Sequence, residues 1–474
     1  MRNLKFLAIS IACVMMLWSC EEKETEDLGL ALSEELSTNV AADNLTPEQQ
    51  KEVLSSTGVS VAQELSTLTD QTAINAAASM IKRMDSNLKS ATPYMSIISS
   101  VASLSDDKNN AYALLKSIEK EVSSEEEVST PDTIINQWNE IKGMTYTYNF
   151  STKELEETEN REDAIIINFP ASETATTNTG KLKISNITTF TITEKGKISE
   201  EFYDLPKSAE ILLTVNSKEE MKFVFTATYK ADGTPTKVNA SLTIGVYSLS
   251  GEFDNTNTKI STDVIFKNAT KNIISFGELA EGTFTEDAMS SMEDESELDK
   301  VVTKAGAYIA IMDVKLIGNI DVKTMMPAGR AIDDKYESQY DALSSKYETK
   351  WKDFYKKYGG YNVDWTNYQK EYMEIQKAEN MEYYDIDKKM NEEMIGVVNT
   401  NIEIALINTA KQKKICDGEF YVVNDAAEYH SDMNIKLKFG DGTYEDIETY
   451  FEKGFDNVAD EFEKMATKMQ NKIE

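Results

Sequence analysis

Apolar residues recur along the chain with two different periods, and the changes of period predict where helices and strands lie. Between residues 45 and 143 they return every three or four positions, as on the packed face of a helix. From about Met144 they return every second position, as in a strand with one buried face. A helical spacing reappears over residues 331–390. The pattern predicts an α+β fold.

Three threonine–proline pairs mark where helices of the first region begin. A threonine hydroxyl at an N-cap accepts an otherwise unpaired backbone N–H, and a proline in the first turn has no N–H to lose. At the first pair, Gln49 stands three positions after Thr46 and is placed to complete a capping box. The pairs are Thr46-Pro47, Thr92-Pro93 and Thr130-Pro131. We expect residues 45–143 to form a small set of packed helices.

The alternating region predicts an antiparallel meander. Two alternating runs, residues 223–229 and 238–246, flank the pair Asp232-Gly233, which is typical of a β-hairpin turn. The polar positions between the apolar ones are rich in Thr, Ser and Lys. We therefore expect one buried face and one solvated face.

Strand-like runs return after the second helical stretch, at residues 402–407, 420–423 and 433–439. The chain then ends in an amphipathic run with an apolar stripe over residues 451–473. We expect the returning strands to rejoin the first sheet. We see no repeat of fixed period.

The predicted fold class is thus α+β: an antiparallel β-meander sheet with helices packed on one face, preceded by a helical N-terminal region. Residues 45–143 are the helical region and residues 144–330 are the sheet region. Residues 331–474 contain a helical hairpin, the returning strands and a C-terminal helix, and we expect them to belong to the same body as the sheet.

The first twenty residues have the parts of a secretory signal. Arg2 and Lys5 precede an apolar run over residues 6–18, which is shorter than the roughly 20 residues that a membrane-spanning helix needs. The sequence Leu-Trp-Ser-Cys that ends at Cys20 resembles a bacterial lipobox. The resemblance implies that residues 1–19 are a lipoprotein signal peptide and that Cys20 is acylated, with chains such as palmitate.

The residues after Cys20 extend this resemblance. Glu21, Glu22, Lys23 and Glu24 look like the export signal of surface-exposed outer-membrane lipoproteins in Bacteroidota. The resemblance implies a protein anchored in the outer membrane by lipid and exposed at the cell surface. Residues 20–44 are acidic and polar, and we expect them to be a flexible tether.

The net charge and the cysteine content of the chain argue against some classes of function and structure. The formal net charge is −33, which opposes binding to nucleic acid. With Cys13 in the signal and Cys20 acylated, Cys416 is the last free thiol, so we expect no intramolecular disulfide. Stability must then come from the hydrophobic core.

The sequence offers little for catalysis. His430 is the one histidine of the chain, which excludes a histidine-rich metal site, and we expect it to be an ordinary surface residue. The glycine and serine motifs of hydrolases, P-loops and dinucleotide sites do not occur. We expect Cys416 to be a small apolar residue within a strand. We predict a non-enzyme with no catalytic residue, no metal and no cofactor.

The segment KYETKWKDFYKKYGGYNVDWTNYQKEY, residues 346–372, is unusually aromatic. Trp351, Trp365 and Tyr368 are candidates for stacking on sugar rings, because flat aromatic faces bind the apolar faces of sugars. Their helical spacing is more typical of core packing with tyrosine hydroxyls at the wet edge. A separate, short motif around Thr133 resembles the O-glycosylation acceptor of Bacteroidota.

The sequence favours a non-catalytic, lipid-anchored surface protein with a binding or structural role toward a glycan, an envelope component or another protein. One alternative is a carrier of lipid or another apolar ligand, because a one-sided sheet with helices across it resembles the LolA/LolB type. A methionine-rich chain suits such a pocket. A surface glycosidase is the weaker alternative, since acidic pairs are abundant.

Overall fold

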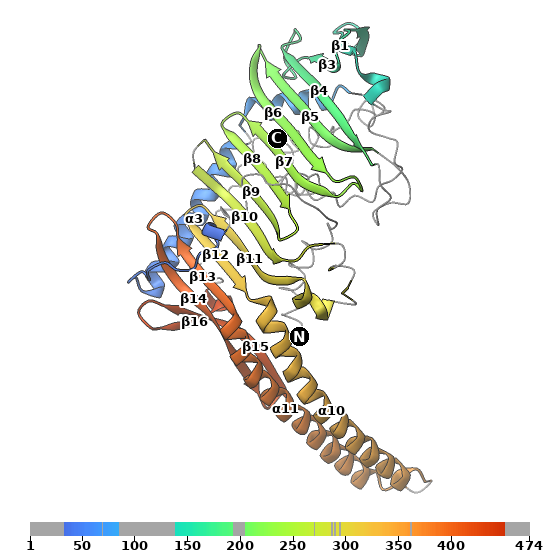
Figure 1. Ribbon diagram of the computed structural model, residues 1–474, viewed down its shortest axis with the longest axis vertical. Coiled ribbons are helices and arrows are strands. Elements are labelled where there is room, and N and C mark those ends of the chain that lie inside the picture. The colour runs from blue at the N-terminus through green and yellow to red at the C-terminus, as the bar shows by residue number, and fades with distance from the viewer. Residues whose placement is uncertain are drawn as a thin grey trace.

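One large β-sheet forms the body of the protein, and a long helical hairpin projects from it (Figure 1). The computed structural model describes residues 33–68, 70–84, 138–192, 204–269, 271–285, 288, 291–292, 295–360 and 363–450. Within these residues the sheet has 16 strands, and the chain combines it with helices. The α+β class predicted from the sequence is confirmed.

The strands follow one another across the sheet almost in chain order, from β16 through β3, with β1 and β2 at the far edge. All neighbours are antiparallel except β1 and β3, which are parallel. The strands are β1 Met144–Tyr148, β2 Leu155–Glu159, β3 Ala164–Phe169, β4 Gly180–Thr191, β5 Asp204–Val215, β6 Lys218–Tyr229, β7 Pro235–Ile244, β8 Tyr247–Asn255, β9 Lys259–Asn268, β10 Lys271–Gly282, β11 Val302–Ile311, β12 Val314–Ile320, β13 Ile402–Asn408, β14 Lys413–Asp425, β15 His430–Phe439 and β16 Tyr444–Asp446. A 3₁₀ helix, η1 Glu295–Lys300, precedes β11.

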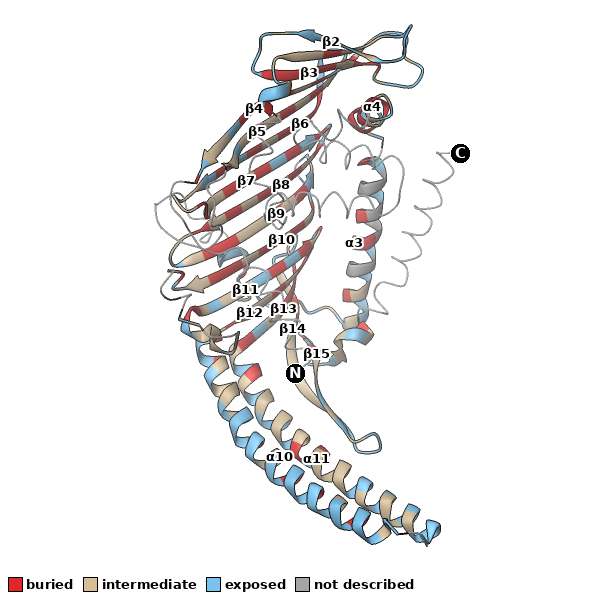
Figure 2. Cartoon of the chain, turned by 90° about the vertical axis from the view of Figure 1, so that its right-hand side faces the viewer, coloured by how far each residue is buried: buried red, intermediate tan, exposed pale blue. Residues whose placement is uncertain are grey.

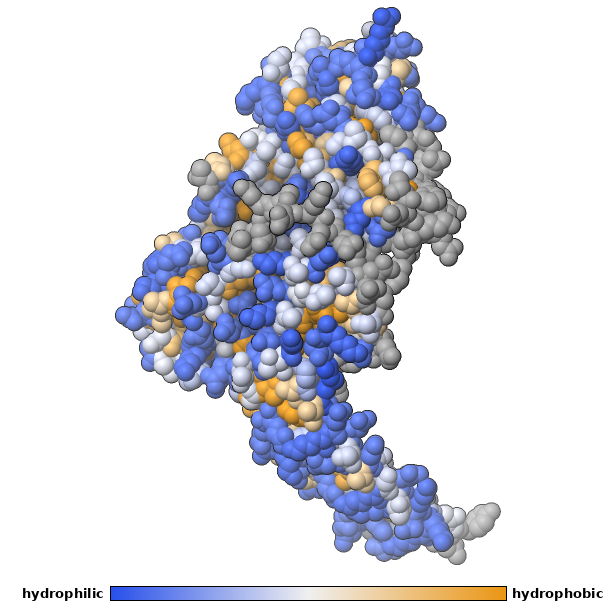
Figure 3. Space-filling view, viewed as in Figure 1, coloured by the Kyte–Doolittle hydropathy of each residue, from blue (hydrophilic) through white to orange (hydrophobic). Residues whose placement is uncertain are grey.

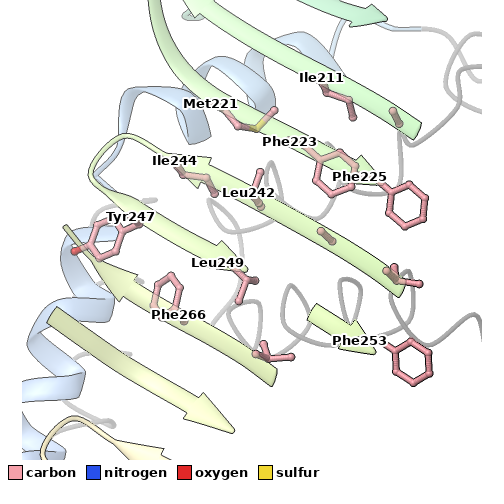
Figure 4. Packing of buried hydrophobic residues seen from close by; sticks show 14 of the residues in the cluster. Ile211, Met221, Phe223, Phe225, Leu242, Ile244, Tyr247, Leu249, Phe253 and Phe266 are labelled. Carbon is pink, nitrogen blue, oxygen red and sulfur yellow. The ribbon is translucent and has the colours of Figure 1, made fainter. Parts of the chain in front are cut away.

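The alternating pattern places one apolar face on the sheet. Phe223, Phe225, Leu242 and Leu249 lie side by side on it, and each is almost fully buried (Figure 4). The β6–β7 turn uses the predicted pair, since Gly233 has a positive φ of 94° and the Asp232 carboxylate accepts the Thr234 N–H at 2.9 Å. This turn joins β6 to β7 in a register that places Phe223 opposite Leu242.

Two N-terminal helices, α3 Pro47–Leu68 and α4 Thr72–Ile81, lie along the apolar face (Figure 2). The start of α3 has the predicted capping box: the Thr46 N–H donates to the Gln49 side-chain oxygen at 3.0 Å, and the Gln49 N–H donates to the Thr46 hydroxyl at 3.4 Å. The two other predicted helix starts, at Thr92-Pro93 and Thr130-Pro131, lie outside the described residues, as does the apolar stripe 451–473.

Residues 33–46 cross the opposite face of the sheet, over β10 to β14, and we call this segment the strap. Leu36 is buried there against Leu279, Tyr308 and Ile317. Ala42 pairs with Lys414 of β14 as an isolated parallel bridge. For residues 33–44 the prediction of a flexible tether is wrong: because Leu36 finds an apolar patch on the sheet, they pack on the body instead.

The helical hairpin is inserted between two neighbouring strands. The helices are α10 Val322–Tyr358, which follows β12, and α11 Trp365–Asn401, which leads into β13. Strands β12 and β13 pair with each other up to Ile320 and Ile402, so the strands after the insertion continue the same sheet. A helix of 37 residues is about 55 Å long. We call α10 and α11 together the arm; it extends well beyond the sheet (Figure 2).

Candidate functional site

The root of the arm is fixed to the body on both sides. Arg330 of α10 makes a two-pronged ion pair with Asp299 of η1, with both N···O distances 2.8 Å. On the other side, Asn399 of α11 exchanges two hydrogen bonds with the Phe420 backbone, at 2.8 and 2.9 Å. The Asn391 amide donates to the Ser431 carbonyl at 3.0 Å. Two-pronged ion pairs and paired hydrogen bonds restrict the orientation of the groups that they join. These contacts therefore hold the arm at a defined angle to the sheet.

A repeated polar rung joins the two helices along the arm. In each rung a lysine–tyrosine pair of α10 meets one glutamate of α11, with the tyrosine hydroxyl donating to the carboxylate at 2.7, 2.9 and 2.8 Å in turn. The lysine of each pair forms an ion pair with the same glutamate. The rungs are Lys335-Tyr336 with Glu393, Lys346-Tyr347 with Glu382, and Lys357-Tyr358 with Glu371.

The rungs recur at every eleventh position of both helices, and the packing between the helices follows the same step. Tyr340 stacks on Tyr383 with ring centroids 6.1 Å apart, and the equivalent pair one step further out, Trp351 with Tyr372, has a centroid distance of 5.2 Å. We expected no repeat of fixed period, and for the arm this prediction is wrong. An eleven-residue period corresponds to about 3.67 residues per turn, close to the natural helix, so two long helices stay in contact with little supercoiling.

The aromatic side chains gather at the distal end of the arm. Phe354 is buried at the centre, with ring centroids 4.9 Å from Tyr368 and 5.0 Å from Tyr358. Trp351 packs on the same side, and its indole N–H donates to Glu379 at 2.8 Å. Both Trp351 and Tyr368 are half-buried, and each is packed in this cluster. We call this set, together with Trp365, the aromatic tip.

Trp365 differs from the other two candidates. It is the first residue of α11 and its side chain is 67% exposed, although its edge contacts Tyr368 at a centroid distance of 5.6 Å. The N-cap positions it: the Asp364 carboxylate accepts the N–H groups of Thr366 and Asn367 at 3.1 and 3.2 Å. The indole of Trp365 is therefore largely exposed at a helix start that its N-cap holds in place.

The contacts within the polar rungs shift the pKa values of the residues that form them. The ion pair and hydrogen bonds from Lys357 and Tyr358 lower the pKa of Glu371, and the corresponding contacts lower the pKa values of Glu382 and Glu393. Burial followed by the bond to Glu382 raises the pKa of Tyr347 to about 12. At neutral pH the glutamates are charged and the tyrosines are neutral donors, which is the state that the rungs require.

The remaining predicted residues lie elsewhere. Cys416 is buried in β14, and burial raises the pKa of its thiol to about 12, which suits a structural residue. His430 is exposed, with its ring 3.0 Å from Asp432. Cys20, Glu21, Glu22, Lys23, Glu24 and Thr133 lie outside the described residues.

A polar hollow of about 330 Å³ lies beside the start of β3 and the middle of β4 and β5. Three carboxylates line it, and each has a partner: Glu162 pairs with Lys183 at 2.7 Å, Asp163 pairs with Lys142 at 3.5 Å, and Glu210 accepts from Asn186 at 2.9 Å. The bond and charge of Lys183 lower the pKa of Glu162. A glycosidase acid needs a raised pKa, so this hollow is a poor candidate for that chemistry.

Two kinds of feature are absent from the described part of the chain. No group of three or more His, Cys, Asp and Glu side chains there is arranged to hold a metal ion. No helix in the same part combines the length and the apolar character that crossing a membrane requires. Comparison of the chain with protein-family models, with curated proteins and with solved structures finds no match.

Proposed function

We propose that this protein is a non-catalytic, lipid-anchored binding protein of the outer membrane, displayed at the cell surface, and that the aromatic tip is its contact surface. The observation that carries the proposal is the 67% exposed Trp365, held by an N-cap on a rigid cluster at the end of the arm. An exposed aromatic residue on a preorganised base costs little entropy to bind a partner.

The shape of the arm supports a role in reaching a partner. On the face shown in Figure 3 the arm is mostly hydrophilic, while hydrophobic residues gather where it joins the sheet. Its interior combines the charged rungs and stacked rings with buried aliphatic residues such as Leu343 and Ile386. Such a hairpin is stable without a further protein covering it, so its end is available for contact.

The anchor in this proposal rests on the resemblance of the residues around Cys20 to a lipobox. The strap begins at Ser33, thirteen positions after Cys20, so the body would lie within about 45 Å of the lipid. Replacing Cys20 with alanine should release the protein from membranes. Protease added to intact cells should cut the wild-type protein along with a known surface control.

The contact surface is tested by co-sedimentation of the chain starting at residue 21 with cell envelopes of a Bacteroidota host that lacks the protein. Trp365→Ala should lose at least tenfold in bound fraction. Tyr444→Ala is the matched control, because Tyr444 is also exposed but lies on the body at β16. Equal sedimentation of the wild type and Trp365→Ala would remove the tip from the proposal.

A second candidate is a carrier of lipid or another apolar ligand. The observation that favours it is the run of large apolar side chains, including Phe223, Phe225 and Phe253, on the face along which α3 and α4 lie (Figure 4). Native mass spectrometry of the chain purified from its host decides this. A persistent adduct of lipid mass would favour the carrier, and a bare polypeptide mass would favour the arm.

A further inference from the structure

We propose that the aromatic tip recognises an acidic polysaccharide, with Trp365 stacking on a sugar ring and the neighbouring lysines contacting its carboxylates or sulfates. This inference rests on the proposed function, because it names the ligand class of the same surface. Three observations carry it: the separation of charge along the chain, the distance of the tip from the body, and the polar surroundings of Trp365.

Charge is distributed very unevenly. The chain as a whole has a formal charge of −33, whereas the distal half of the arm, residues 346–382, contains seven lysines and seven carboxylates and is neutral. Two of those carboxylates have structural tasks, since Glu371 belongs to a rung and Asp364 caps α11. Lys356 and Lys370 are exposed on the two helices. The end of the arm is thus neutral, with exposed lysines, on an acidic protein.

The length of the arm keeps its end away from the negative charge of the body. Asn391 of α11 still bonds to Ser431 of β15, and from there the helix extends outward to Trp365, a distance of about 39 Å. The Debye length at physiological ionic strength is about 8 Å. The field of the acidic body is therefore screened at the tip, so an anionic partner that the sheet repels can approach the end of the arm.

The neighbours of Trp365 favour a glycan over a lipid surface. Asp364, Thr366 and Asn367 flank it and are all exposed. Inserting this end into a bilayer would remove a carboxylate and several amide and hydroxyl groups from water without new partners. A sugar ring offers an apolar face to the indole and hydroxyl groups at its edge, which match these donors and acceptors.

The test measures binding of the chain starting at residue 21 to polygalacturonate and to the same polymer with its carboxylates methyl-esterified, by affinity electrophoresis. Alginate and heparin extend the acidic set. We expect an affinity for at least one acidic polymer at least tenfold above that for the neutral ester. It should fall as the salt concentration rises, because salt screens the lysines. Trp365→Ala should abolish the binding, and Lys356→Ala/Lys370→Ala should weaken it about tenfold.

Two controls make the result specific. Lys267→Ala/Lys271→Ala removes two exposed lysines from β9 and β10 of the body and should change nothing. The variants must keep the circular dichroism of the wild type. Vesicles of phosphatidylcholine and phosphatidylglycerol, mixed in a seven-to-three ratio, test the lipid source of negative charge.

Each of the remaining outcomes would contradict part of the inference. Equal binding of the acidic polymer and the neutral ester, lost in Trp365→Ala, would overturn the acidic class and leave the tip as a glycan-binding surface. Binding to the anionic vesicles but to none of the polymers would replace the glycan with a membrane. Failure to bind any of these probes overturns the inference, while the envelope sedimentation above still decides the proposed function.

Discussion

The Tyr347 hydroxyl donates a hydrogen bond of 2.9 Å to Glu382, and the same bond recurs one repeat away in both directions along the arm, from Tyr336 and from Tyr358. The recurrence means that α10 and α11 run antiparallel in one register over their whole contact. A slip by one residue would break all three rungs together. The arm is therefore a single rigid element, which is what a contact surface at its end requires.

Tyr347→Phe should lower the free energy of unfolding of the arm by about 1–2 kcal/mol, because the ring stays and only a bond to a charged acceptor is lost. Tyr355→Phe is the control, since Tyr355 is exposed at the tip. Hydrogen exchange of the α10 and α11 amides measures the effect. Equal protection in both variants would show that the rungs do not hold the arm together.

The arm should loosen in acid. The pKa values of Glu371, Glu382 and Glu393 are lowered in the folded arm, so their stabilisation is complete above the ordinary carboxyl pKa of 4.5. It is lost as pH falls through the lowered values. Hydrogen exchange of the arm should increase below about pH 4 relative to the sheet. The variant with all three glutamates replaced by glutamine should be less stable at pH 7 and lose this dependence.

Some of these features could be predicted from the sequence because they are local. The Thr46–Gln49 capping box and the Asp232-Gly233 turn each lie within a few residues. The rungs are also visible in the sequence, as Lys-Tyr pairs and glutamates that recur at every eleventh position. Their meaning appears only when two helices face each other, since each rung joins residues that are at least 13 positions apart.

Two features could not be predicted from spacing. Trp365 continues the helical stripe of Tyr368 and Tyr372, so the pattern favours burial. It is exposed because α11 begins there, at the outer end of the hairpin, where the contact between the helices begins. Leu36 stands in an acidic stretch that resembles a tether, and its burial depends on an apolar patch of the sheet that is formed by residues far later in the chain, from Leu279 onward.

Arg330→Lys should make the direction of the arm less defined, because lysine cannot make the two-pronged pair with Asp299. Spin labels on cysteines at Ser344 of the arm and Thr226 of the sheet, both exposed, report the distance. We expect a broader distance distribution in Arg330→Lys. Lys352→Ala, which breaks an ion pair within α10 alone, should leave the distribution unchanged.

Cys416 should not interfere with such labelling. Its pKa of about 12, against an ordinary 9.0, reduces the thiolate at pH 8 by about a thousandfold, and its side chain is buried. In the chain starting at residue 21, the native protein should resist maleimide for hours and react at once in denaturant. Rapid reaction of the native protein would show that β14 opens readily.

The strap should connect the proposed lipid anchor to the root of the arm. The Asn319 amide donates to the Leu36 carbonyl at 2.9 Å, and Asn319 lies just before α10. The Thr38 hydroxyl donates to Glu403, just after α11, at 2.8 Å.

Leu36→Ala should cost about 2–3 kcal/mol of stability in this region, from lost burial and the cavity left behind. Hydrogen exchange should then increase in β12 and β13, while Val246→Ala, at an exposed site, should have no effect. Increased exchange confined to the strap would mean that the anchor holds the body without supporting the arm.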